Sequence, residues 1–313
     1  MIISASRRTD IPAFYSEWLI NRIRAGFLLT RNPFNTHQVS RVSLLPEDVD
    51  AIVFWTRNPT KLLPYLDELS EIGHRFYFQF TLTGYPRLIE SKTLNPHKAL
   101  EVFKRLSEKI GAEKVIWRYD PILFSNLLPF DEHIRLFSKI ATELEGHTRR
   151  VVISFADFYQ KTEKNLKAID SLIYSDITQN HELCLTLSQR LSEIARQHGL
   201  DIYSCAEEVN LTGQGIQHGK CIDEALINDL FGLLIPSSKD SGQREACGCV
   251  KSIDIGTYNT CLHGCQYCYA TYNQHQANSN FKKHSPESPF LLGGTDGVDP
   301  LLLEPVRFQP PLF

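Results

Sequence analysis

Short apolar runs that alternate with helix-like stretches restrict the fold of this chain more than any other feature. Seven runs are rich in β-branched and aromatic residues, and their nearly continuous apolar character suits strands buried on both faces of a parallel sheet. They span residues 1–5, 51–56, 76–82, 114–118, 150–155, 201–205 and 252–256. We therefore expect a sheet built mainly of parallel strands.

Stretches with helical periodicity lie between these runs. Residues 183–194 carry leucine or isoleucine at positions 183, 187, 191 and 194, the spacing of one helix face, and Gly199 follows as a candidate C-cap. Residues 130–144 carry a similar stripe, with Asp131 as a candidate N-cap. Residues 15–25 and 96–110 each end before a glycine. These four stretches are predicted helices.

Strands and helices that alternate along a chain predict right-handed βαβ units. Six or seven such units favour an α/β fold of the TIM type, a partial or complete (βα) barrel, with a doubly wound open sheet as the alternative. No strand is followed by a glycine-rich nucleotide-binding loop of the usual kinds. We expect residues 1–272 to form one domain and residues 273–313 an irregular tail packed on it, with residues 273–289 as a loop.

Composition excludes several classes of protein. Of 313 residues, 42% are hydrophobic, and 33 Lys and Arg oppose 36 Asp and Glu for a net charge of −3. The hydrophobic content argues against disorder, and the near-neutral charge argues against a non-specific nucleic-acid coat protein. No apolar run approaches the ~18 residues of a membrane span, and the N-terminus turns polar too soon for a signal peptide. We expect a soluble, cytoplasmic protein.

Polar side chains follow most of the predicted strands. Because the site of a βα barrel lies at the C-terminal ends of its strands, we expect these residues to gather in one place. Four of them are arginines, which suits a ligand carboxylate or phosphate. The candidate binding residues are Ser6, Arg7, Arg8, Asp10, Arg57, Arg118 and Glu207, and the candidate catalytic residues are Tyr119, Asp120 and Tyr159. The alternative is that these polar residues only clamp loops.

Five of the eight cysteines fall within residues 247–268, which is the most specific signal in the chain. In a long chain with no sign of secretion, clustered thiols more often hold a metal than form disulfides. Cys261, Cys265 and Cys268 have the spacing C-x3-C-x2-C. Three thiolates can bind three irons of a [4Fe–4S] cluster and leave the fourth iron without a protein ligand. The alternative is a zinc site with His263 as the fourth ligand.

The string from Cys261 to Ala270, with Tyr267 before the third cysteine, resembles the cluster motif of the radical S-adenosylmethionine (radical SAM) superfamily. It is most similar to the spore-photoproduct-lyase-like branch. The chain as a whole resembles a bacterial family with a domain of unknown function. Members of that family start with Ser-Arg-Arg-Thr-Asp-Ile-Pro and end with a radical-SAM-like cysteine cluster. Residues 6–12, 54–59, 117–121 and 247–270 carry this second resemblance.

The resemblance to the radical SAM superfamily implies an enzyme whose [4Fe–4S] cluster binds SAM and, once reduced, cleaves it to a 5′-deoxyadenosyl radical. The carboxylate of SAM would pair with Arg118 or with one of Arg7, Arg8 and Arg57. Tyr119 and Tyr159 would line the pocket or donate hydrogen. A reductant such as flavodoxin or ferredoxin would supply the electron, and the substrate stays open.

The position of the motif departs from the superfamily, in which the cysteines follow the first strand of a partial βα barrel. Here they follow the last predicted strand, residues 252–256. A shared fold would therefore be circularly permuted, with the segment after Cys268 leading in space to residues 1–5. The Gly-Gly-Glu segment that receives the amino group of SAM in the superfamily is absent. Under permutation Ser6, Arg8 or Asp10 would take its place.

Four further cysteines, Cys205, Cys221, Cys247 and Cys249, would be enough for a second [4Fe–4S] cluster or a structural zinc. The alternative is that one or two of them are small buried hydrophobic residues. Cys184 lies beside the leucine stripe of a predicted helix and is expected in the core.

Two other functions stay open at this point. The first is repair or modification of nucleic acid, prompted by the photoproduct-lyase-like string and the arginine-rich N-terminal third, for which a local basic groove would suffice. The second is a non-enzymatic iron–sulfur or zinc protein that carries electrons or senses oxygen. Such a protein would hold metal but would form no 5′-deoxyadenosine from SAM.

Overall fold

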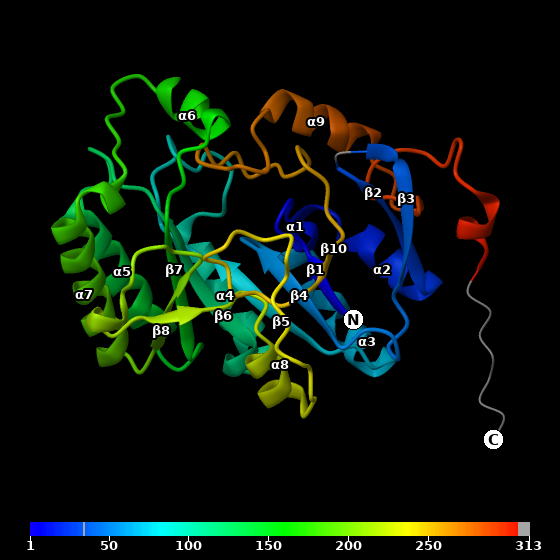
Figure 1. Cartoon of the computed structure of the whole chain (residues 1–313), viewed down its shortest axis with the longest axis horizontal. Coiled ribbons are helices and arrows are strands. Elements are labelled where there is room, and N and C mark those ends of the chain that lie inside the picture. Colours follow the sequence, from blue (N-terminus) through cyan, green and yellow to red (C-terminus); the bar gives the residue numbers. More distant parts are fainter. Residues whose placement is uncertain (34, 306–313) are drawn as a thin grey trace.

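A parallel sheet of eight strands organises the chain, with the strand order β10-β1-β4-β5-β6-β7-β8-β9 (Figure 1). The structure is a computed structural model that describes residues 1–33 and 35–305. The sheet strands are β1 (Ile2–Ala5), β4 (Ala51–Thr56), β5 (Phe76–Thr81), β6 (Val115–Ile122), β7 (Arg150–Phe155), β8 (Asp201–Cys205), β9 (Gln217–Gly219) and β10 (Ile253–Asp254). Each neighbouring pair is parallel. The prediction of an α/β fold with a parallel sheet is confirmed.

The helices connect these strands. They are α1 (Ile11–Phe14), α2 (Ser16–Ala25), α3 (Leu66–Ile72), α4 (Pro96–Ile110), α5 (Phe130–Leu144), α6 (Gln160–Lys167), α7 (His181–Gln197), α8 (Glu224–Phe231) and α9 (Gln274–Lys283). Helix α4 begins where Asn95 accepts a hydrogen bond from the backbone N–H of His97, and it ends at Gly111, whose φ is +98°. Helix α5 has the predicted bounds, but its N-cap is Pro129 and not Asp131. Asp131 lies in its first turn, where the positive end of the helix dipole stabilises a carboxylate.

The two faces of the sheet carry different partners. Side chains such as Phe54, Phe78 and Trp117 belong to a large hydrophobic cluster that includes residues of the outer helices α2 to α5 and α7. The alternate positions, such as Val53 and Tyr77, pack against residues 221–250, which include α8. Because side chains alternate along a strand, adjacent residues of one strand have different surroundings. This alternation decides which polar residues reach the functional site.

A β-hairpin and a helix near the C-terminus are among the elements that the sequence did not predict. Strands β2 (Phe27–Asn32) and β3 (Asn35–Ser43) form an antiparallel hairpin. Neither strand is a continuous apolar run in the sequence, so the pattern used for the other strands does not predict them. Helix α9 lies within residues 273–289, which were expected to be a loop. Asn273 caps α9 by accepting from the N–H of Gln276, and only Ala277 and Asn280 are fully buried, so the helix needs no apolar stripe.

The described part of the tail after α9 contains one short 3-10 helix, Pro300–Leu303, and packs on the hairpin. Phe290 and Val298 are buried against Phe27 and Leu29. The N–H of Leu29 also donates to the carbonyl of Pro289 at 2.9 Å. Of the predicted tail, residues 306–313 lie outside the described residues.

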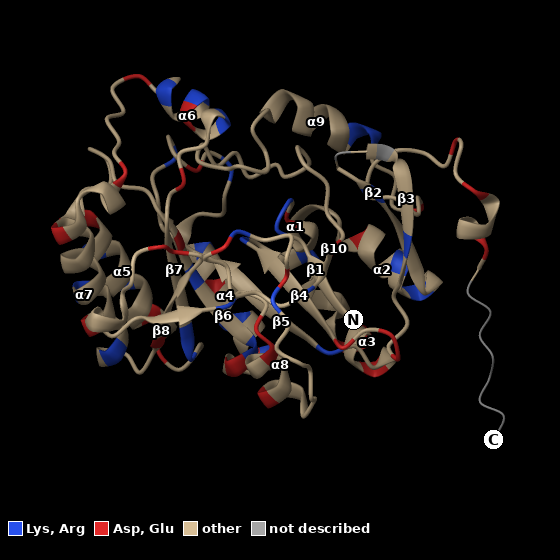
Figure 2. Cartoon of the chain, in the orientation of Figure 1, with Lys and Arg blue, Asp and Glu red and all other residues tan. Residues whose placement is uncertain are grey.

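Charged residues of both signs are interspersed along the outer helices α6 and α7 (Figure 2), as the net charge of −3 suggests. Within the described residues, every helix is either too short or too polar to cross a membrane.

Candidate functional site

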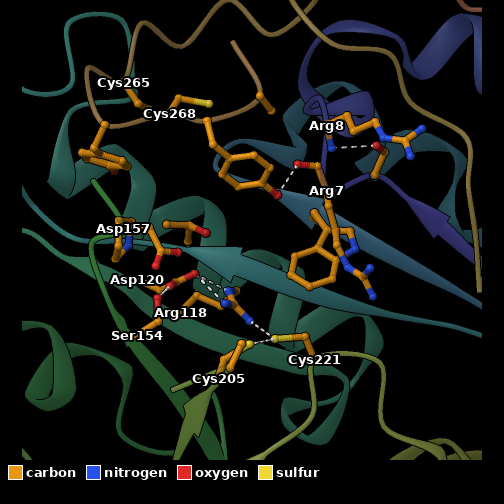
Figure 3. A pocket seen from close by; sticks show the side chains of 18 of the residues that line it. Arg7, Arg8, Arg118, Asp120, Ser154, Asp157, Cys205, Cys221, Cys265 and Cys268 are labelled. Carbon is orange, nitrogen blue, oxygen red and sulfur yellow. Dashed lines mark hydrogen bonds and ion pairs between the residues drawn. The ribbon is translucent and has the colours of Figure 1, made fainter. Parts of the chain in front are cut away.

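An open cavity of about 430 Å³ lies where β1 and β4 to β8 end (Figure 3). Strands β4 to β8 contribute side chains to its wall, and β1 contributes through the segment that directly follows it, as expected for the C-terminal edge of a parallel sheet. The lining includes the predicted residues Ser6, Arg7, Arg8, Asp10, Arg57, Arg118, Asp120 and Tyr159, and seven of the eight cysteines, Cys205, Cys221, Cys247, Cys249, Cys261, Cys265 and Cys268. Cys184 is instead buried in α7, within the core.

The three cysteines of the C-x3-C-x2-C motif lie on one loop that follows β10. Burial raises the pKa of Cys261 and Cys268, and it raises that of Cys265 to about 12, which the neighbouring Arg57 opposes. Each of the three thiols interacts with at least one of the others. Thiolates in such a place are costly unless a cation compensates for the lost hydration. A positively charged metal group would meet that need.

A buried network holds this loop in place. Arg57 forms an ion pair with Glu90, with 2.9 Å between Nη1 and Oε2, and the hydroxyl of Tyr267 hydrogen-bonds both residues. The backbone of Cys265 is joined to Glu90 by an antiparallel bridge. His263 Nε2 lies 2.7 Å from Asp10 Oδ2. The cysteine loop is therefore tied to the segments that follow β1, β4 and β5.

Asp254 joins the loop to the start of the chain. This residue ends β10, and its carboxylate accepts hydrogen bonds from the hydroxyls of Ser4 and Ser6 at 3.0 and 2.6 Å. It also accepts from the backbone N–H of Arg7 at 2.9 Å and of Gly256 at 3.0 Å. Strands β1 and β10 are adjacent in the sheet, so these bonds fix the segment after β1 beside the segment after β10.

The other four cavity cysteines form a second group. The Sγ atoms of Cys205 and Cys221 are 2.6 Å apart, and Cys249 interacts with both Cys221 and Cys247. Hydrogen bonds from its two cysteine neighbours, with Arg7 nearby, lower the pKa of Cys249. The group is placed by the end of β8, by the segment after β9 and by residues 247–249, which pack on the inner face of the sheet.

Arg118 and Asp120 connect this group with the middle of the cavity (Figure 3). The guanidinium of Arg118 donates to Cys221 Sγ at 2.8 Å, and its Nε donates to Asp120 Oδ2 at 2.9 Å. The hydroxyl of Ser154 also donates to Asp120. Arg118 and Arg7 both lie over the ring of Trp55, at 5.1 and 5.6 Å from its centroid.

Two predicted residues are placed away from the cavity wall. Tyr119 lies in the core, where its hydroxyl hydrogen-bonds His133 Nδ1 at 2.9 Å. It occupies the opposite face of β6 from Arg118 and Asp120, because adjacent side chains of a strand alternate. Glu207 accepts from the N–H of Phe155 at 2.8 Å, and burial raises its pKa to about 8.

Several residues in or near the cavity were not among the predicted site residues. Trp55 follows the alternation of β4 toward the cavity and was predictable from it. Gln243 and Arg244 line the cavity from an irregular segment, and Glu90 lies behind its wall in another; no periodic pattern marks any of the three. Arg244 pairs with Asp157 at 2.8 Å across 87 residues, a contact that only the folded chain defines.

Within the described residues, no three His, Cys, Asp or Glu side chains are arranged to hold a metal ion. Residues 2–270 match a protein family that is described as a domain of unknown function, DUF1848. No curated protein matches the sequence.

Proposed function

We propose that this chain, which belongs to the DUF1848 family over residues 2–270, is an iron–sulfur enzyme of the radical SAM type. Cys261, Cys265 and Cys268 would bind a [4Fe–4S] cluster through three of its irons, which leaves one iron for SAM. When bound and reduced, the cluster supplies the electron that cleaves SAM to a 5′-deoxyadenosyl radical. The observation that carries this proposal is that all three thiols of the motif line one cavity at the carboxyl edge of the sheet.

The three thiols are not spaced as the ligands of a bound metal ion, but their type and their place on one cavity wall suit such a cluster. Three thiols on one anchored loop face a space that arginines and aromatic rings also line. Arg57 lies close enough to Cys265 to oppose the rise in the pKa of that thiol, so it would favour the thiolate. The network of Arg57, Glu90 and Tyr267 is complete without the cluster and would hold the loop ready for it.

Two arginines are the best candidates for the carboxylate of SAM. Arg57 and Arg118 already have buried carboxylate partners, Glu90 and Asp120. Arg8 comes no closer than 4.0 Å to Asp254, and Nη2 of Arg7 is buried with no hydrogen-bond partner among the described residues. Arg7 or Arg8 would therefore gain most from a ligand carboxylate. Ser6 and Asp10, the other candidates for SAM, already make hydrogen bonds within the fold.

The strand order supports the finer prediction of a circularly permuted partial barrel. From β1 to β9 the sheet strands follow one another in chain order, without the reversal of a doubly wound sheet. β10 pairs with β1 on the side away from β4, which is the position that a first barrel strand would occupy. The cysteine loop would then follow the first strand in space, although it follows the last strand in sequence.

The test is formation of 5′-deoxyadenosine. The protein is reconstituted with iron and sulfide without oxygen, and then SAM and dithionite are added. We expect about four irons for this site and nucleoside in the wild type, and neither in the variant Cys265→Ala. Cys184→Ala is the matched control, because this thiol lies in the core away from the cavity. Iron without nucleoside would instead favour an electron carrier, and zinc without nucleoside would refute the proposal.

A further inference from the structure

The second group of cysteines, Cys205, Cys221, Cys247 and Cys249, has a common place in the fold. They come from three segments of the chain, and all four line the cavity. The Sγ atoms of Cys205 and Cys221 are 2.6 Å apart, and Cys249 is near enough to interact with both Cys221 and Cys247. Four thiols from different segments are the number that a [4Fe–4S] cluster or a zinc ion needs.

Two arginines supply the positive charge that such a centre requires. Arg118 is buried and donates to Cys221 Sγ at 2.8 Å. Arg7 interacts with Cys249 and Cys221, and its Nη2 is buried with no hydrogen-bond partner in the described part of the chain. Asp120 already balances the charge of Arg118, whereas neutral thiols would leave Arg7 beside them without an ion-pair partner among the described residues; a metal group with four thiolates keeps a net negative charge and would supply one.

We propose that Cys205, Cys221, Cys247 and Cys249 bind a second [4Fe–4S] cluster in the same cavity as the first. The cluster is favoured over a closed zinc site because the four thiols face an open space, which leaves room for inorganic sulfide. Hydrogen bonds to cluster sulfurs tune the reduction potential, and Arg118 is placed to make one. The assignment uses none of the residues of the C-x3-C-x2-C motif.

Iron and labile sulfide per chain test the assignment after anaerobic reconstitution of the full chain. We expect about eight irons in the wild type, and about four in the double variant Cys221→Ala/Cys249→Ala. The double variant Cys265→Ala/Cys268→Ala should also keep about four, held by the second group. Cys184→Ala controls for the loss of a thiol and should keep all of the iron. Circular dichroism checks that each variant is folded.

The outcomes separate this assignment from the proposed function. Four irons in the wild type that are all lost in Cys265→Ala/Cys268→Ala would refute the second cluster and leave the first intact. Four irons in the wild type that are lost only in Cys221→Ala/Cys249→Ala would support the second cluster and refute the first. One zinc per chain, lost in Cys221→Ala/Cys249→Ala, would also refute the second cluster.

The wild type alone provides a measurement that does not depend on variants that fold. Its reduced form should show two electron paramagnetic resonance signals. SAM should change only the signal of the cluster that has an iron without a protein ligand. A single signal, changed completely by SAM, would overturn the assignment.

Discussion

His133 is a buried histidine whose environment makes stability depend on pH. Its Nδ1 is hydrogen-bonded to the Tyr119 hydroxyl, and its Nε2 is hydrogen-bonded to the Leu123 carbonyl. Burial lowers the pKa of His133 from 6.5 to about 4. Between these two values the unfolded chain binds a proton that the folded chain does not. The free energy of unfolding should therefore fall as the pH drops from 6.5 to about 4, by about 3 kcal/mol in total.

The variant His133→Gln should lack this part of the pH dependence. Urea unfolding at several pH values between 4 and 7 measures it, with His97→Gln as the exposed control. If the wild type and His133→Gln lose stability in parallel, His133 is not the buried neutral group described here.

The ion pair between Arg57 and Glu90 should matter more for stability than any exposed pair. Glu90→Gln leaves the buried guanidinium of Arg57 without a counter-charge, and we expect a loss of about 3 kcal/mol in the free energy of unfolding. Glu143→Gln removes an exposed pair with Lys104 by the same substitution, and the loss should be much smaller because solvent screens this pair. Equal losses in urea unfolding would contradict the difference in burial.

Single site residues are most predictable from the sequence where reactive side chains follow buried strands. Arg7, Arg118 and Asp120 are examples, because polar residues after parallel strands gather at one edge of the sheet. Tyr119 lies in the same stretch but on the other face of β6, because side chains alternate between the two faces of a strand. Glu90 could not be found, since its role depends on contact with Tyr267 across 177 residues.

At the scale of elements, buried strands and amphipathic helices were predictable, and elements held by capping or by edge contacts were not. Helices α4 and α5 have the predicted bounds, because each carries a clear apolar stripe. Helix α9 was missed because a cap and a few contacts stabilise it. Strand β10 lies within the predicted run of residues 252–256 but is only two residues long, and hydrogen bonds from neighbouring segments to Asp254 hold it.

Replacing Asp254 should therefore loosen one junction of the sheet. Asp254→Ala leaves the donors of Ser4, Ser6, Arg7 and Gly256 without their acceptor, and we expect a loss of about 2 kcal/mol or more. Hydrogen exchange should become faster at β10 and in residues 257–271 but not in β7. Asp176→Ala, which removes the cap of a short 3-10 helix, is the control and should affect only its own turn. Unchanged exchange after β10 would refute this role.

At the scale of the whole molecule, the segment after α9 is part of the hydrophobic packing. Phe290 is 2% exposed and lies against Phe27 and Leu29 of the hairpin. Phe290→Ala should lower the free energy of unfolding by about 3 kcal/mol, since it leaves a cavity between the tail and the hairpin. Leu301 is 68% exposed, and Leu301→Ala should change it little. Urea unfolding compares the two variants, and an unchanged midpoint for Phe290→Ala would mean that the tail contributes no stability.

The pairing of β1 with β10 also has a consequence for biosynthesis. Residues 2–5 leave the ribosome early, whereas their partner residues 253–254 are added about 10 to 50 s later at ordinary rates of translation. Until then one edge of the nascent sheet has no partner, and the cysteine loop does not exist. Loading of the proposed cluster at Cys261, Cys265 and Cys268 would therefore follow synthesis of nearly the whole chain, and truncated translation products would carry an incomplete cavity.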